Sequence, residues 1–330
     1  MTSEDLKIGV VGLGKMGLLH ASILNVLPGV KLAAVCEKAS FTRKLAKKVL
    51  SDIPVVGDVS EFIGLNLDAV FVTTSTLSHF SVAKTVYQKQ IACNLFIEKP
   101  LAWNYAQSKE LCELAAQNSG VNMVGYLRRF MVTFMKAKEL LNHGVIGEPV
   151  SFKVNGFSSD FCGIRGSKMS AARGGVLRDL GSYAIDIALW FFGELEPKSA
   201  NIESLTGLSA EDAVHFIMQS KSNPLKGEFS VSWCAEGYRM PEVILSVEGS
   251  KGIIEVNDDK VSLKLKDGKK SNLYRHNLND NVKFWLGGPE YYREDAYFVD
   301  CIRNNTVAEP TFAAASRVDL AIETIHGNTE

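Results

Sequence analysis

Three chemically capable residues end a short apolar run near residue 100. Residues 95–97 predict a buried strand of a parallel sheet, and Glu98, Lys99 and Pro100 follow directly. Open α/β sheets bind their ligands at the carboxyl ends of the strands, so an amine there can enter a site. Proline cannot continue the ladder, and the bond before it is where a cis peptide costs least. A solvated Lys–Glu pair at a loop explains the same residues. The choice between this interpretation and a functional site depends on the rest of the chain.

A second group of such residues lies between positions 174 and 190. Asp179, Tyr183 and Asp186 are spaced as i, i+4 and i+7, and we expect them to share one helix face. Gly181 lies inside the pattern and weakens a helix by about 1 kcal/mol relative to alanine, which indicates a packing reason or a close approach. The alternative is an amphipathic helix with a solvated acidic stripe.

A glycine-rich turn follows the first predicted strand, at residues 6–11, and opens a helical pattern. It has the G-x-G-x-x-G spacing in the context that this motif requires. The first glycine permits a tight turn, the second lets the backbone approach a pyrophosphate, and the third lets helix and strand pack closely. The helix N-terminus supplies N–H groups for phosphates. We expect the turn to bind a dinucleotide through Gly12, Leu13, Gly14, Lys15, Met16 and Gly17.

Further cofactor contacts are expected at the ends of the next strands. Glu37 ends the strand at residues 31–36, where a carboxylate accepts hydrogen bonds from an adenosine ribose. A carboxylate repels a 2′-phosphate and favours NAD, although the adjacent Lys38 can tolerate NADP; a solvent-facing glutamate at a turn is the alternative. As a lone histidine, His79 is better explained by a structural role than a catalytic one. The remaining expected pocket residues are Thr74, Ser75, Thr76, His79, Glu98 and Lys99.

The order of elements predicts an α/β protein with two domains. Strands and helices alternate through residues 1–124, which predicts a Rossmann doubly wound parallel sheet. Residues 125–330 predict an α+β domain with a large, mostly antiparallel sheet. Its closing helices are expected at 291–304 and 313–325. One face of that sheet is expected to be open, and we expect a homodimer or homotetramer through it.

Composition excludes several classes of protein. The 330 residues are 46% apolar and 22% charged with a net charge of −1, so neither nucleic acid nor an anionic membrane is an expected partner. There is no apolar run long enough for a bilayer and no signal-peptide pattern, which predicts a cytoplasmic location. The six cysteines are widely spaced without C-x-x-C pairs, so we expect reduced thiols and no metal site.

With these motifs in this order, the chain resembles the glucose–fructose oxidoreductase/inositol dehydrogenase family (Gfo/Idh/MocA). The resemblance implies an NAD(P)-dependent oxidoreductase that transfers hydride between nicotinamide and a secondary alcohol or ketone of a sugar, inositol or nucleotide-sugar. The family's motif lysine corresponds to Lys99. Its helix motif D-x-G-x-H-x-x-D corresponds to Asp179, Gly181, Tyr183 and Asp186. The usual histidine is therefore Tyr183 here, as in the glucose–fructose oxidoreductase and dihydrodiol dehydrogenase branches.

The resemblance and the residues together suggest a mechanism. We expect Tyr183 to be the acid/base, with Lys99 favouring its phenolate and stabilising the substrate oxyanion. Asp179 would orient the substrate hydroxyl or Lys99, and Lys99 itself is an alternative proton shuttle. The competing functions are an NAD-dependent glycosidase, a dihydrodiol- or bilin-type reductase, and a non-catalytic NAD-binding protein. Candidate substrate contacts are Arg128, Arg165, Asp179, Tyr183, Trp233 and Tyr292, and further pocket candidates are Lys168, Arg173 and Tyr238.

Overall fold

The computed structural model describes residues 5–163, 173–207 and 210–327. The chain forms two compact units, one of residues 1–126 with 282–319 and one of residues 127–281 with 320–330. The first break lies next to the boundary expected at residue 124. The sequence did not predict that residues 282–319 belong to the first unit.

The first unit contains a parallel sheet of six strands. Their order reverses direction between β1 and β4, and ligands of such sheets bind outside the carboxyl ends of the strands at this point. The predicted doubly wound sheet is therefore confirmed. In spatial order its strands are β3 (Val55–Val56), β2 (Val30–Cys36), β1 (Leu6–Val11), β4 (Ala69–Val72), β5 (Asn94–Glu98) and β6 (Asn122–Gly125).

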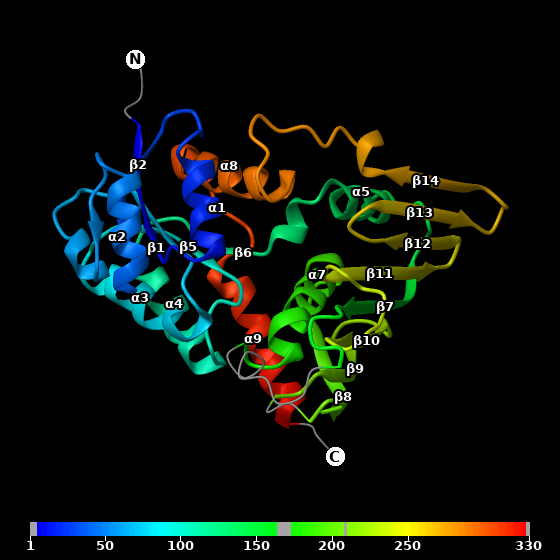
Figure 1. Cartoon of the computed structure of the whole chain (residues 1–330). Coiled ribbons are helices and arrows are strands. Elements are labelled where there is room, and N and C mark those ends of the chain that lie inside the picture. Colours follow the sequence, from blue (N-terminus) through cyan, green and yellow to red (C-terminus); the bar gives the residue numbers. More distant parts are fainter. Residues whose placement is uncertain (1–4, 164–172, 208–209, 328–330) are drawn as a thin grey trace. The chain divides into compact units, whose positions relative to one another are not determined.

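Helices flank this sheet in two visible pairs, α1 beside α8 and α3 beside α4 (Figure 1). Helix α8 joins the first unit because Phe298 is fully buried and meets Phe71 and Phe96 edge-on, with ring centroids 5.4 and 5.7 Å away. The described helices of this unit are α1 (Lys15–Leu24), α2 (Ser40–Val49), η1 (Val59–Phe62), α3 (Thr76–Gln88), α4 (Tyr105–Ala116), α8 (Pro289–Asn304) and the start of α9 (Phe312–Gly327).

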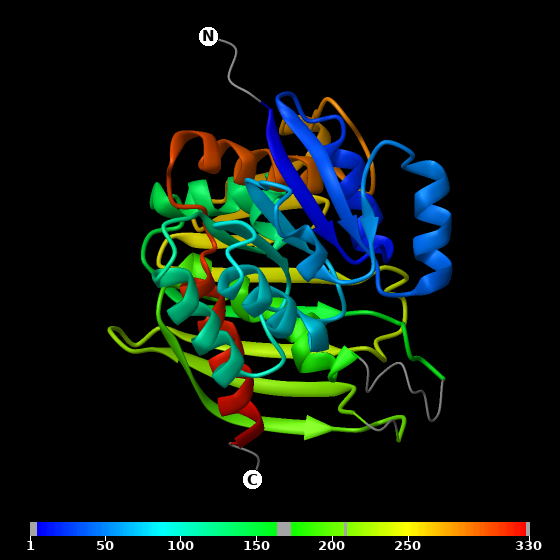
Figure 2. The same cartoon turned by 90° about the vertical axis from the view of Figure 1, so that its left-hand side faces the viewer.

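The second unit contains a sheet of eight strands, shown from another side in Figure 2. All neighbours are antiparallel except β7 and β10, which confirms the predicted, mostly antiparallel sheet. Strand β14 was not predicted. In spatial order the strands are β14 (Lys270–Tyr274), β13 (Lys260–Leu265), β12 (Gly252–Val256), β11 (Glu242–Gly249), β7 (Pro149–Phe157), β10 (Lys226–Ser232), β9 (Ala213–Ser220) and β8 (Leu195–Glu203).

One face of the larger sheet is covered by helices and the other is open. Buried and exposed residues alternate along β10, where Phe229 is buried while Glu228 is exposed and pairs with Lys153. Helices α5 (Val132–Asn142) and α7 (Ser182–Phe192) contact the covered face. The open face expected from the sequence is therefore present within this unit. No described helix is long and apolar enough to cross a membrane.

Two helices of the second unit differ from their expected form. The helix expected at 128–143 is divided into a 3₁₀ turn, η2 (Leu127–Phe130), and α5. The helix expected to carry Asp179 and Tyr183 begins as a π-helical turn, η3 (Leu177–Gly181), and continues as α7. Such turns shift the residues that follow around the helix axis and occur frequently at functional sites.

Candidate functional site

The glycine-rich turn has the geometry of a phosphate-binding loop. Gly12 has φ +96°, and a Cβ on Gly17 would lie 1.7 Å from the Gly12 carbonyl oxygen, so both positions require glycine. A Cβ on Gly14 would meet no atom within 4 Å. Gly14 also begins α1 without any side-chain cap, which leaves the first N–H groups of the helix for an anion.

A cleft of about 710 Å³ lies beside this turn at the carboxyl ends of β1, β2 and β4. Its wall contains polar groups from the turn, from the end of β2 and from the start of α3. Among the residues expected to bind the cofactor, those that line it are Gly12, Gly14, Glu37, Lys38, Thr74 and Ser75.

Two backbone N–H groups fix the Glu37 carboxylate at this cleft. The N–H of Leu13 donates to Oε2 at 2.7 Å, and the N–H of Ala39 donates to Oε1 at 2.7 Å. The guanidinium of Arg43 donates to the carbonyl oxygens of Glu37 and Lys38 and so holds the loop after β2. An anchored carboxylate, an open Gly14 and an uncapped helix terminus fit the adenosine and pyrophosphate of NAD.

The other expected cofactor residues are not among those that line the cleft. Leu13 and Gly17 are buried beneath the turn, whereas Lys15 is exposed on the first turn of α1. His79 is buried, with Nδ1 2.9 Å from the Pro100 carbonyl oxygen and Nε2 3.1 Å from that of Thr74. This position supports the structural role expected for His79. Met16 and Thr76 are half-buried.

Lys99 follows β5 at the same edge of the sheet. Residues 95–97 are fully buried and Glu98 is 8% exposed, whereas Lys99 is half-buried at the end of the strand. The bond between Lys99 and Pro100 is cis. Glu98 turns its side chain back, and its Oε2 accepts a hydrogen bond from the Lys99 N–H at 3.1 Å. The backbone that carries the lysine is thus held by its neighbour.

In the second unit, Asp179 lies in a network of donors. Its Oδ2 accepts a hydrogen bond from Trp233 Nε1 at 3.2 Å and from Arg173 Nη1 at 3.3 Å. Arg173 also pairs with Asp160 at 2.6 Å. Trp233 is fully buried. Trp233 therefore holds Asp179, and the substrate contact expected of Trp233 stays a prediction.

Tyr183 lies beneath a guanidinium. The central carbon of Arg128 is 4.6 Å from the centroid of the Tyr183 ring, a cation–π distance. Arg128 is buried, and its Nε and Nη2 each donate to Asp258 at 3.2 Å, while Nη2 also donates to the Pro241 carbonyl oxygen. Arg128 therefore contacts Tyr183 and is itself held by Asp258 and the Pro241 carbonyl oxygen.

The third carboxylate of the helix motif has a different environment. Asp186 is 1% exposed and binds the guanidinium of Arg129 with distances of 2.7 and 3.0 Å. Each of the three residues expected to share one helix face, Asp179, Tyr183 and Asp186, therefore contacts a different arginine. Asp186 is the member committed to a buried ion pair.

The remaining expected substrate residues are Tyr292, Arg165 and Lys168. Tyr292 lies on α8 in the first unit, whereas Asp179 and Tyr183 belong to the second. Arg165 and Lys168 lie outside the described residues. Sequence reasoning missed several residues whose partners only tertiary structure reveals, namely the buried His20, Glu294 and Asp295 and the half-buried Arg129 and Asp258.

Comparison with known proteins identifies the family. The family described as "Oxidoreductase family, NAD-binding Rossmann fold" matches residues 6–126, and the "GFO/IDH/MocA C-terminal domain" matches residues 134–255. The chain belongs to the Gfo/Idh/MocA family. The expected family and its NAD-binding fold are therefore confirmed.

Named relatives of this Gfo/Idh/MocA protein include inositol dehydrogenases. It is 29% identical to scyllo-inositol 2-dehydrogenase (NAD(+)) of Bacillus subtilis, over 62% of this chain and 57% of that protein. It is 29% identical to myo-inositol 2-dehydrogenase of Thermotoga maritima, over 57% and 55% of the two chains. The matches thus span little more than half the length of these relatives. A solved levoglucosan dehydrogenase in complex with NADH and L-sorbose has a TM-score of 0.86 at 19% identity, with 98% and 96% of the chains covered, which shows the fold.

Proposed function

We propose that this protein is an NAD-dependent dehydrogenase or reductase that acts on a secondary alcohol or ketone of a sugar or inositol. The observation that carries the proposal is the half-buried Lys99 at the end of β5, on the same sheet edge as the cleft with its anchored Glu37. The named relatives act on inositols, which supports a polyol-like substrate.

NAD is the favoured cofactor over NADP. The Glu37 carboxylate is held by the N–H groups of Leu13 and Ala39 at the place where an adenosine ribose is recognised. Its negative charge opposes a 2′-phosphate. Lys38 is exposed at the cleft and lessens this opposition, so NADP is expected to bind more weakly and not to be excluded.

Three side chains have separate proposed roles. Bound NAD supplies the hydride acceptor. Lys99 would stabilise negative charge that develops on the substrate oxygen, and Tyr183 would exchange the hydroxyl proton. Asp179, oriented by Trp233 and Arg173, would accept a hydrogen bond from a substrate hydroxyl. Lys99 remains the alternative group for proton exchange.

A substrate panel tests the proposal. Purified protein with NAD is incubated with inositols, aldoses, glycosides and nucleotide-sugars, and the absorbance of NADH is followed. The Lys99→Met variant is expected to retain NAD affinity and to lose turnover by about 10³-fold or more. Lys109→Met, at an exposed position of α4, is the matched control and should behave as wild type. Wild-type activity in Lys99→Met would contradict the assignment.

The same panel separates the competing functions. Cleavage of a glycoside without net formation of NADH would identify an NAD-dependent glycosidase. Turnover only with aromatic diols or tetrapyrroles would identify the reductase type, for which Tyr183 in place of histidine is the supporting observation. Cofactor binding without any turnover would indicate a binding protein.

We also propose that the open face of the larger sheet forms a homodimer or homotetramer. This face carries exposed residues along several strands and a depression of about 410 Å³ between β8, β9 and β10. Light scattering of the purified protein, and of a variant with a charged residue in place of Ile217, tests the assignment.

A reducing, cytoplasmic location accords with the six free cysteines.

A further inference from the structure

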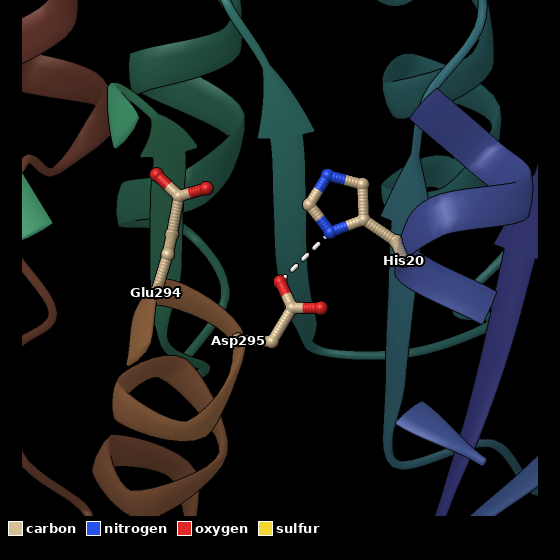
Figure 3. A group of neighbouring side chains, drawn as sticks. All are labelled: His20, Glu294 and Asp295. Carbon is tan, nitrogen blue, oxygen red and sulfur yellow. Dashed lines mark hydrogen bonds and ion pairs between the residues drawn. The ribbon is translucent and has the colours of Figure 1, made fainter. Parts of the chain in front are cut away.

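A buried histidine joins three elements of the first unit. His20 on α1 has no exposed surface; its Nδ1 lies 2.8 Å from Oδ1 of Asp295 on α8, and its Nε2 lies 2.8 Å from Oε1 of Glu98 on β5. Figure 3 shows the Asp295 carboxylate turned toward the ring. The three elements therefore meet at one imidazole.

The partners of the ring define its protonation. An ionised carboxylate is only an acceptor, so two carboxylates at the two nitrogens are both satisfied when both nitrogens carry a proton. Burial lowers the pKa of His20, but the charge and hydrogen bond of Asp295, and then those of Glu98, outweigh it and hold this pKa well above its ordinary value. Burial raises the pKa of Asp295, and the charge and hydrogen bond of His20 oppose that rise. The carboxylate oxygens at 2.8 Å from both ring nitrogens are the contacts that suit an imidazolium.

Aromatic rings surround the imidazole. The rings of Phe71, Phe96 and Tyr291 lie 5.7, 5.2 and 6.2 Å from the imidazole by centroid distance. Glu294 is a further acid near the ring and is fully buried. Burial, and then the charge of Glu98, raise the pKa of Glu294 well above its ordinary value and so favour its protonated form.

The ion pair reaches the backbone of Lys99 through a single carboxylate. Oε1 of Glu98 is hydrogen-bonded to Nε2 of His20, and Oε2 of Glu98 accepts a hydrogen bond from the N–H of Lys99. Its rotation is thereby fixed from both sides. Because α1 begins at the glycine-rich turn, His20 also ties the phosphate-binding helix to the strand that presents the lysine.

A metal ion is the competing occupant of this cluster. Among the described residues, His20, Glu294 and Asp295 form the group whose potential ligand atoms lie within 4.8 Å of one another. A metal needs a lone pair on the imidazole, and metal–ligand bonds are about 2.0–2.2 Å long. Both ring nitrogens already face carboxylates at hydrogen-bond distance, so the geometry favours a proton there.

We propose that His20, as an imidazolium, is a positioning residue that fixes Glu98 and through it Lys99. The inference rests on the proposed function of Lys99. It predicts that loss of the imidazolium lowers turnover while NAD binding, which depends on Glu37 and the glycine-rich turn, is retained.

Kinetics of His20→Gln test the inference. Glutamine carries no charge and cannot donate to both carboxylates from ring-like positions, so kcat should fall by about 10- to 100-fold through misplacement of Lys99. The KM for NAD should change less than about twofold. His276→Gln, at an exposed turn, is the matched control. A kcat within twofold of wild type in folded His20→Gln would overturn the inference.

Nuclear magnetic resonance gives a readout that does not depend on turnover. With ¹⁵N-labelled histidine, both ring nitrogens of His20 should carry protons at pH 8, and no stoichiometric metal should be found by elemental analysis. An unprotonated ring nitrogen at pH 8, or one bound metal per chain, would overturn the inference. If the wild type oxidises no substrate, the proposed function fails, while this measurement still decides the state of His20.

A milder variant covers the case in which His20→Gln does not fold. Asp295→Asn removes one of the carboxylates facing His20 and leaves Glu98 and Glu294. The imidazolium is then less stabilised and should lose its proton at a lower pH. As pH rises, the variant should therefore lose turnover at a lower pH than the wild type does. A pH profile that superimposes on that of the wild type would overturn the inference.

Discussion

The guanidinium of Arg128 lies over the ring of Tyr183, with 4.6 Å between its central carbon and the ring centroid. Asp258 and the Pro241 carbonyl oxygen hold Arg128 in this position. A cation over a tyrosine ring stabilises negative charge on the phenol more than it stabilises the neutral form. The arrangement thus gives the proposed acid/base residue a fixed cationic partner within its own unit.

Arg128→Met should therefore make Tyr183 a weaker acid. In the oxidation direction, the ascending limb of kcat/KM should move to higher pH, and turnover at pH 7 should fall by about tenfold or more. The measurement is a pH profile of the wild type and the variant. Tyr183→Phe supplies the control: if Tyr183 is the titrating group, adding Arg128→Met to the Tyr183→Phe variant should produce no further movement of the limb.

Alanine substitutions at the second and third glycines of the turn should have different effects. Gly17→Ala would place a Cβ against the Gly12 carbonyl, and we expect a loss of about 2–3 kcal/mol of unfolding free energy. Gly14→Ala meets open space, so stability should change by less than about 1 kcal/mol while NAD affinity falls. Urea unfolding and NADH titration distinguish the two. Equal effects of both variants on stability would contradict the prediction.

Glu37→Gln should change cofactor preference. The amide retains the size of the side chain and removes the charge that opposes a 2′-phosphate, so the affinity ratio of NADPH to NADH should rise by about tenfold. Fluorescence titrations with both cofactors measure this ratio. Glu61→Gln is a comparison at a nearby exposed carboxylate, and an equal effect there would show that general charge is responsible.

Glu294→Gln should stabilise the protein at neutral pH. Both Glu294 carboxylate oxygens are buried without a hydrogen-bond partner among the described residues, and its pKa is raised well above the ordinary value, chiefly by burial. The folded state then keeps a proton that the unfolded chain releases, so stability falls as pH rises above about 4.3 toward the folded-state pKa. Glutamine does not titrate and should add about 1 kcal/mol or more at pH 8.

Urea unfolding at pH 5 and pH 8 measures this difference. The gain from Glu294→Gln should be larger at pH 8. A variant that is destabilised equally at both values would mean that Glu294 is ionised and paired in the folded protein.

Local sequence identified much of the fold because its signals lie close together in the chain. The turn from Gly12 to Gly17, the acidic end of β2 and the sequence Glu98-Lys99-Pro100 each lie at the end of a strand, where spacing alone has a physical meaning. These positions lie around the cleft or at the same sheet edge. The alternating strands of the second sheet were predicted for the same reason.

The remaining features depend on partners far away in the chain. His20 and Asp295 are separated by 275 residues, and nothing near either residue specifies the other. The π-helical turn before Ser182 is a second feature that helical periodicity does not reveal. Arg128 and Arg129 are adjacent, yet they bind Asp258 and Asp186 respectively, a choice made only by the folded chain.

The return of α8 to the first unit bears on how this protein is made. During synthesis, β4 and β5 leave the ribosome long before Phe298 and Asp295 are added to the chain. Phe71, Phe96 and His20 therefore lack their covering helix during most of synthesis. A fragment ending at Tyr126 would contain every strand of the nucleotide-binding sheet and still expose that aromatic surface. Such a fragment should aggregate unless residues 282–319 are supplied.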